Sequence, residues 1–122
     1  DYFIKVSDNI RIAEIKELET EFDVIKGRYD EALVKLRSSY TRHSDVFNKR
    51  GKSRCLRKIG DVLVLKGNVD DALTRYKRVE RELIRSDQIN DESFITRINI
   101  ARIYTYKGEY SKTEEIFSKI KK

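Results

Sequence analysis

The chain has 122 residues, of which 39% are hydrophobic and 39% charged, and its formal net charge is +6. This composition is too apolar for a disordered chain and more charged than an average globular domain, so one folded domain is expected. Proline is absent and glycine occurs five times, which favours long helices over a sheet joined by many turns. Apolar runs are far shorter than the roughly 18 residues of a membrane span.

The first half of the chain predicts two helices. The first runs from about Asn9 to Lys26, and Gly27 ends it because glycine adopts the left-handed backbone of a helix stop without steric cost. Its apolar residues recur every three or four positions and form one stripe: Ile12, Ile15, Leu18, Phe22 and Ile25. The second runs from about Tyr29 to Phe47. Its inward-facing residues are Ala32, Leu33, Leu36, Tyr40 and Phe47, and the non-periodic stretch 48–51 breaks it.

The second half predicts four more helices. The third spans about Lys52 to Lys66 and the fourth Val69 to about Arg85. A polar stretch from Ser86 to Asp91 follows; the fifth helix then spans about Glu92 to Lys107 and the sixth Tyr110 to Ile120. Their apolar residues again recur at helical spacing, among them Leu56, Ile59, Val62, Leu63, Ala72, Leu73, Tyr76 and Val79.

One short phrase occurs three times in the chain. Lys26-Gly27-Arg28-Tyr29-Asp30-Glu31-Ala32 is followed by Lys66-Gly67-Asn68-Val69-Asp70-Asp71-Ala72 and by Lys107-Gly108-Glu109-Tyr110-Ser111-Lys112-Thr113. The glycines are 40 and 41 residues apart, and a period in this range is typical of a stacked repeat array. Each unit buries its apolar face only against a neighbour, so we expect the units to stack.

The later two units agree beyond the glycine. The middle unit carries Leu56, Ile59, Gly60, Leu63, Gly67, Val69, Ala72, Tyr76 and Val79; the last carries Ile100, Ala101, Tyr104, Gly108, Tyr110, Phe117 and Ile120. This pattern resembles the tetratricopeptide repeat, in a variant with a period of about 40 residues rather than the usual 34. Small residues at Gly60, Ala72 and Ala101 would let paired helices approach closely.

The resemblance implies an all-α fold of three stacked antiparallel hairpins that form a right-handed superhelix. Residues 1–122 would then be a single domain with repeats at about 9–47, 52–86 and 92–122. In that family the first helix of each pair lines a concave groove. The corresponding residues here are Arg54, Arg57, Asp61, Val64, Leu65, Ile95, Ile98, Arg102, Thr105 and Tyr106. We therefore expect a non-catalytic module that binds a peptide or partner protein, as a sensor or scaffold arm of a larger cytoplasmic protein.

A basic run gives an alternative function. The region from Arg42 to Lys58 holds seven cations against the lone Asp45. A nucleic-acid-associated regulatory fragment would use such a patch, although few aromatic residues are interleaved for stacking on bases. Its anion-contact candidates are Arg42, Lys49, Arg50, Lys52 and Lys58.

Residue types that carry catalysis are scarce. His43 is the only histidine and Cys55 the only cysteine, and neither has a neighbour in sequence that makes a ligand or nucleophile pattern. We expect Cys55 to be a small core residue, and we expect no catalytic residue, no metal and no cofactor. The single cysteine also fits a cytoplasmic location.

The ends of the chain suggest a longer protein. It starts at Asp1 rather than Met, which indicates a fragment. The last hairpin stops at Lys122 without a polar capping helix, which would expose apolar surface. We expect either further repeats or self-association through that hairpin, and no membrane contact.

Overall fold

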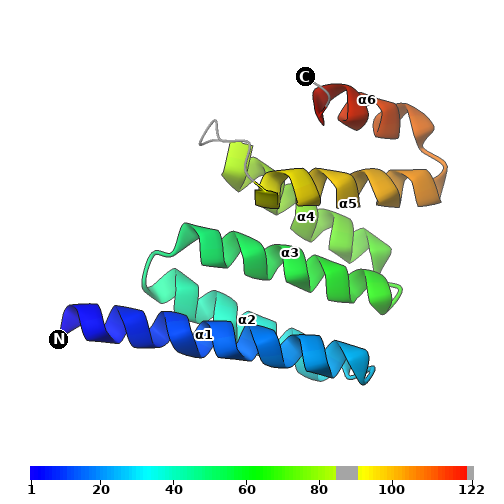
Figure 1. The fold of residues 1–122 in the computed structure, drawn as a ribbon. Helices are drawn as coiled ribbons and strands as arrows, with labels where there is room; N and C mark the ends of the chain where they lie inside the picture. Colours follow the sequence, from blue (N-terminus) through cyan, green and yellow to red (C-terminus); the bar gives the residue numbers. More distant parts are fainter. Residues whose placement is uncertain (85–90, 121–122) are drawn as a thin grey trace.

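The structure, a computed structural model, describes residues 1–84 and 91–120 and contains only helices in that part of the chain. The six helices are α1 (Tyr2–Ile25), α2 (Tyr29–Asp45), α3 (Lys49–Leu65), α4 (Val69–Ile84), α5 (Asp91–Lys107) and α6 (Tyr110–Ile120). The expected all-α fold is confirmed, and neighbouring helices pack in sequence order (Figure 1). The predicted end of the fourth helix at Arg85, the polar stretch from Ser86 and the residues after Ile120 lie outside the described residues.

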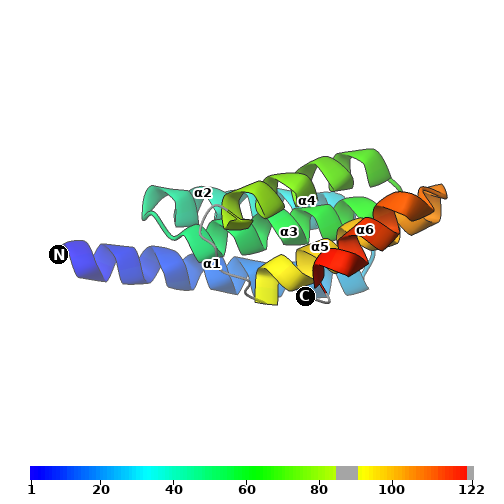
Figure 2. The same ribbon diagram turned by 90° about the horizontal axis from the view of Figure 1, so that it is seen from above.

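The helices form antiparallel pairs stacked in chain order. Figure 1 shows α1 with α2, α3 with α4 and α5 with α6, each pair joined by a tight turn. In Figure 2 the second helices α2 and α4 lie along one side of the stack, and α1 and α5 lie along the other. Helices that are neighbours in the chain are therefore also neighbours in the stack.

The three repeated glycines make the same turn within each pair. Gly27, Gly67 and Gly108 have positive φ angles of 74°, 89° and 79°, as predicted for helix stops. In each turn the amide of the residue after the glycine donates to a carbonyl five residues earlier, with N···O distances of 2.7 to 2.8 Å. The repeated phrase is thus a repeated turn, and an added Cβ at these glycines would be strained by the backbone angle rather than by contacts.

The turn between α2 and α3 has the same geometry without a glycine. Phe47 has φ 57°, and the amide of Asn48 donates to the carbonyl of His43 at 2.9 Å. The expectation that Phe47 ends the second helix and faces inward was wrong: α2 ends at Asp45, and Phe47 is 85% exposed. A left-handed residue points its side chain away from the helix that it terminates.

Phe47→Gly is expected to raise the free energy of unfolding by about 1 kcal/mol, because glycine has no Cβ to oppose the left-handed backbone. The exposed ring makes little packing to lose. Urea unfolding followed by circular dichroism measures the change. Phe47→Ala is the control, since alanine removes the ring but keeps the Cβ, and a gain as large as that of glycine would contradict the backbone explanation.

The predicted break over residues 48–51 is shorter than expected, because α3 begins at Lys49 rather than Lys52. Asn48 caps α3, and its side-chain oxygen accepts from the amide of Gly51 at 3.3 Å. Gly51 lies in the first turn and is buried. A Cβ at this position would lie 2.3 Å from His43 Nδ1, so the glycine makes room for the histidine rather than breaking the helix.

The core forms both within and between the pairs, from apolar residues that the sequence predicted. Its fully buried members include Ala32, Leu33, Leu36, Leu56, Ile59, Val62, Leu63, Ala72, Tyr76, Val79, Ile100, Ala101 and Tyr104. Gly60 allows a close approach of α3 and α4, since a Cβ there would lie 2.5 Å from the ring of Tyr76. The expected role of Gly60 as a small residue between close helices is confirmed.

The apolar stripe of α1 faces the opposite way from what its pattern suggests. Such a stripe normally faces the core, yet its five residues are 38 to 81% exposed. The buried face instead carries Ala13, Glu17, Thr20 and Asp23. Polar groups fill this face because α2 and α3 supply partners: Ser39 donates to the carbonyl of Ala13 at 3.0 Å.

None of the described helices, α1 included, combines the length and apolarity needed to cross a bilayer.

Candidate functional sites: a buried polar cluster and an open groove

Two places in the structure bring polar side chains together. The first is a buried cluster between α1, α2 and α3, which we call the Glu17 cluster: Glu17, His43, Arg54, Cys55 and Lys58. The second is an open groove across α3, α4 and α5, described below. The centre of the cluster is closed to solvent and the groove is open to it, so only the groove can admit a ligand from solution.

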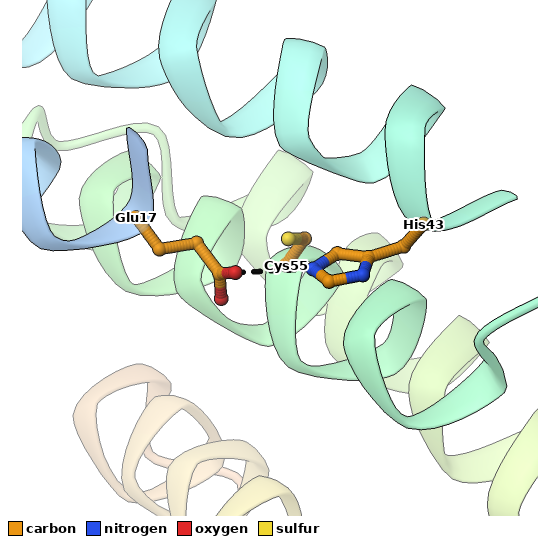
Figure 3. A group of neighbouring side chains, drawn as sticks. All are labelled: Glu17, His43 and Cys55. Atoms are coloured by element: carbon orange, nitrogen blue, oxygen red, sulfur yellow. Dashed lines mark hydrogen bonds and ion pairs between the residues drawn. The ribbon is translucent and has the colours of Figure 1, made fainter. Parts of the chain in front are cut away.

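Glu17 lies at the centre of its cluster. Arg54 donates from Nε to Glu17 Oε1 at 2.6 Å and from Nη2 to Oε2 at 3.1 Å, a two-point ion pair. His43 Nε2 lies 3.1 Å from Oε2, and Lys58 Nζ lies 3.7 Å from Oε1. Figure 3 shows Glu17, His43 and Cys55 approaching one another from α1, α2 and α3. One carboxylate therefore connects three helices.

Asn48 determines how His43 uses its ring nitrogens. The Asn48 side-chain oxygen accepts from an amide, so its Nδ2 group is the donor that lies 3.0 Å from His43 Nδ1. With Nδ1 accepting, the imidazole carries its proton on Nε2 and donates it to Glu17. The histidine is a fully buried structural bridge between the α2–α3 turn and α1.

The surroundings shift the titration of two members of the cluster. Burial acts to raise the pKa of Glu17, but hydrogen bonds from Arg54 and His43 and the charges of Arg54 and Lys58 outweigh it, so the pKa is lowered. Burial, followed by the negative charge of Glu17, raises the pKa of Cys55 to about 12. The carboxylate is held ionised and the thiol is held protonated.

Donor atoms of Glu17, His43 and Cys55 all lie within 4.8 Å of one another, a set that also suits a zinc ion. The local charge favours the ion pair instead. Both oxygens of Glu17 are already bound by Arg54, and Lys58 adds a second positive charge beside them. A metal would also have to displace the proton of the Cys55 thiol. Cys55 is fully buried, as expected for a core residue, and is closed to a substrate.

The groove is an open pocket of about 570 Å³, a size typical of ligand sites. Its lining residues are Asp61, Val64, Leu65, Gly67, Val69, Tyr76, Asn99, Arg102, Ile103 and Tyr106. Apolar side chains dominate it, and three of them reach solvent: Tyr106 is 82% exposed, Leu65 54% and Val64 39%. Arg102 is an exposed cation at the same place.

The polar floor of the groove is centred on Asp61. Tyr76 donates to Asp61 Oδ1 at 2.5 Å, Asn99 donates to the same oxygen at 3.1 Å, and Arg57 donates to Oδ2 at 2.7 Å. Burial raises the pKa of Asp61 despite these donors. Arg57 is held further by Glu92, with Nε 2.6 Å from Oε2. The floor is therefore pre-organised by contacts between α3, α4 and α5.

The structure brings half of the predicted groove residues into this pocket: Asp61, Val64, Leu65, Arg102 and Tyr106. The other five lie outside its lining. Arg54 and Arg57 are engaged by Glu17 and Glu92. Thr105 donates to the carbonyl of Ala101 at 2.9 Å and lies 3.2 Å from the hydroxyl of Thr113. Ile95 and Ile98 lie earlier on α5.

The basic residues between Arg42 and Lys58 do not form one continuous patch, because several of them contact different partners. Arg42 donates to Asn9 at 3.0 Å, Lys52 lies 5.5 Å from the ring centre of Tyr40, and Lys58 is turned to Glu17. Lys49 and Arg50 are exposed in the first turn of α3. An anion contact at these residues stays a prediction.

Sequence reasoning missed Glu17 and the link from His43 to Cys55. Glu17 lies 26 residues from His43 and 37 residues from Arg54 along the chain, beyond any local pattern. One signal was present: Glu17 lies on the face of its helix opposite the apolar stripe, one repeat before Arg57. Arg57 also binds a carboxylate of another pair, although that ion pair is only partly buried, so the same position forms an ion pair between pairs in two successive repeats.

No protein-family model matches the chain, and a search of curated proteins gives no match.

Proposed function

We propose that the chain is a non-catalytic protein-interaction module that binds a peptide or an exposed segment of a partner protein in the groove. We further propose that its three hairpins belong to the tetratricopeptide type and continue a right-handed superhelix, as part of a scaffold or sensor. The three equivalent turns and the Gly60–Tyr76 contact support this second part. The observation that carries the binding proposal is the groove itself.

Exposed apolar side chains support a binding role for the groove. Val64, Leu65 and Tyr106 lie together in one concavity, and clustered exposed apolar residues in a pocket mark contact sites. The carboxylate at the centre of the polar floor is engaged, because Asp61 receives three hydrogen bonds. A ligand therefore gains by burying apolar surface without leaving the floor unsatisfied.

Arg102 determines the expected chemistry of the ligand. It is exposed beside the apolar lining, and the structure gives it no ion pair among the described residues. A peptide with a large apolar side chain for the Tyr106 surface and a carboxylate one or two positions away fits both features. Asp61 opposes a carboxylate placed deeper in the groove.

Selection from a phage-displayed library of random peptides tests the proposal. Tyr106→Ala is expected to weaken the selected peptides about tenfold or more, equivalent to about 1.4 kcal/mol, by isothermal titration calorimetry. Tyr110→Ala is the matched control, since Tyr110 is also an exposed tyrosine (63%) but lies outside the groove. Peptides that tolerate both Tyr106→Ala and Arg102→Ala, or a library that yields no binder, would contradict the groove assignment.

A further inference from the structure

Both ends of the stack expose apolar residues at positions that the inner helices bury. Equivalent positions in the three repeats are found by aligning the turn glycines. A residue of the first repeat corresponds to the residue 40 positions later in the second repeat, and a residue of the second to the one 41 positions later in the third. Ile15 and Phe22 of α1 correspond to Cys55 and Val62 of α3, and these to Thr96 and Ile103 of α5. The last four are at most 4% exposed, whereas Ile15 is 58% and Phe22 56% exposed.

This face of a first helix is the one that contacts the preceding pair. Cys55 Sγ lies within 4.8 Å of side-chain atoms of Glu17 and His43, which belong to α1 and α2. Ile15, one repeat earlier, points from α1 in the equivalent direction. Within residues 1–84 and 91–120 no helix covers it, because α1 packs mainly against α2.

The other end of the stack shows the complementary surface. Phe117 of α6 corresponds to Tyr76 of α4 and to Leu36 of α2. Tyr76 is 2% exposed and shares Asp61 with Asn99 of the following pair, and Leu36 is fully buried. Phe117 is 42% exposed. The position that in earlier pairs reaches the next pair is open on α6.

We propose that two copies of the chain stack head to tail, with the α6 end of one copy on the exposed α1 face of the other. This contact would repeat the interface that joins successive pairs within the chain. The exposed residues of α1 and α6 occupy positions that are buried in that interface in the other repeats. A head-to-tail contact leaves one surface of each kind open at the two ends of an assembly, so the assembly grows with concentration until a ring closes.

Analytical ultracentrifugation of three proteins tests the proposal. The wild type is expected to show a mean mass that rises with concentration. A front-blocked variant, Ile15→Glu/Phe22→Glu, and a back-blocked variant, Phe117→Glu, each lose one surface and are expected to remain monomers. Mixed in equal amounts, they still have one open surface of each kind, and the mean mass should rise toward twice that of the monomer and no further.

Val34→Glu is the control for added charge, because Val34 is an exposed apolar residue (63%) of α2 away from both surfaces, and it should assemble like the wild type. Circular dichroism checks that the variants are folded, and Phe117→Ser replaces Phe117→Glu if the glutamate unfolds the chain. A wild type that stays monomeric at every concentration overturns the proposal. Self-association of either blocked variant alone overturns the head-to-tail arrangement.

Discussion

Glu17→Gln is expected to lower the free energy of unfolding by about 3 kcal/mol, because it breaks a buried ion pair from one side. The amide cannot accept the two hydrogen bonds that Arg54 donates at 2.6 and 3.1 Å. It also weakens the acceptor for His43, which is fully buried and has no water to turn to. Arg54 is 29% exposed and partly regains hydration, so we place the loss at the lower end of the range for such pairs.

Urea unfolding measures this loss, and Glu19→Gln is its matched control. Glu19 is two residues away on the same helix and pairs with Lys35 at 3.3 Å, but it is 52% exposed. Exposed pairs contribute roughly 0 to 1 kcal/mol, so the control should change stability little. Similar losses for the two variants would show that the Glu17 cluster does not depend on its buried carboxylate.

The same variant predicts a change in the dependence of stability on pH. The pKa of Glu17 is lower in the folded chain than its ordinary value of 4.5. A carboxyl group of this kind stabilises the fold fully above its ordinary pKa, and that contribution is lost as the pH falls through the folded value. The difference in stability between the wild type and Glu17→Gln should therefore be largest near neutral pH and narrow below about pH 4.5.

The sequence was sufficient to predict six helices and the three glycine turns because these depend on local features. It did not predict that α1 begins at Tyr2 rather than about Asn9, nor that Phe47 makes the α2–α3 turn. Glycine at a positive φ angle marks each stop within a pair, and apolar spacing marks each helix. The pattern of α1 predicted a stripe but not its direction, because periodicity says that residues share a face and not which neighbour covers it. That direction depends on Ser39, His43 and Arg54 as partners for the polar face of α1.

The sequence predicted only those residues of the candidate site whose position is set by the repeat pattern. Val64, Leu65 and Tyr106 lie near the ends of first helices, so repeat equivalence placed them on one surface, and the structure puts them in one groove. Arg54 and Arg57 lie earlier on α3, and the repeat assigned them to the same surface. Their engagement by Glu17 and Glu92 depends on carboxylates from other pairs, and no pattern within one repeat contains that information.

Gly60→Ala is expected to lower the free energy of unfolding by about 2 kcal/mol, although glycine in a helix interior is normally about 1 kcal/mol worse than alanine. The reason is the ring of Tyr76, which a Cβ on Gly60 would approach to 2.5 Å. The ring is 2% exposed, and its hydroxyl is held by Asp61, so it has little freedom to move. Overpacking then outweighs the gain in helix propensity.

Tyr76 should control the size of this effect, because the first repeat pairs the two equivalent positions differently. The equivalents of Gly60 and Tyr76 are Thr20 and Leu36 in the first repeat, where a larger residue on the first helix faces a smaller one on the second. Tyr76→Leu should therefore create room, so that adding Gly60→Ala to it costs less than adding it to the wild type. Tyr76→Phe keeps the ring and removes the hydroxyl, and in that background Gly60→Ala should cost about as much as in the wild type. Urea unfolding of the single and double variants measures the coupling. Equal costs of Gly60→Ala in all three backgrounds would mean that the contact with the Tyr76 ring does not set the spacing of α3 and α4.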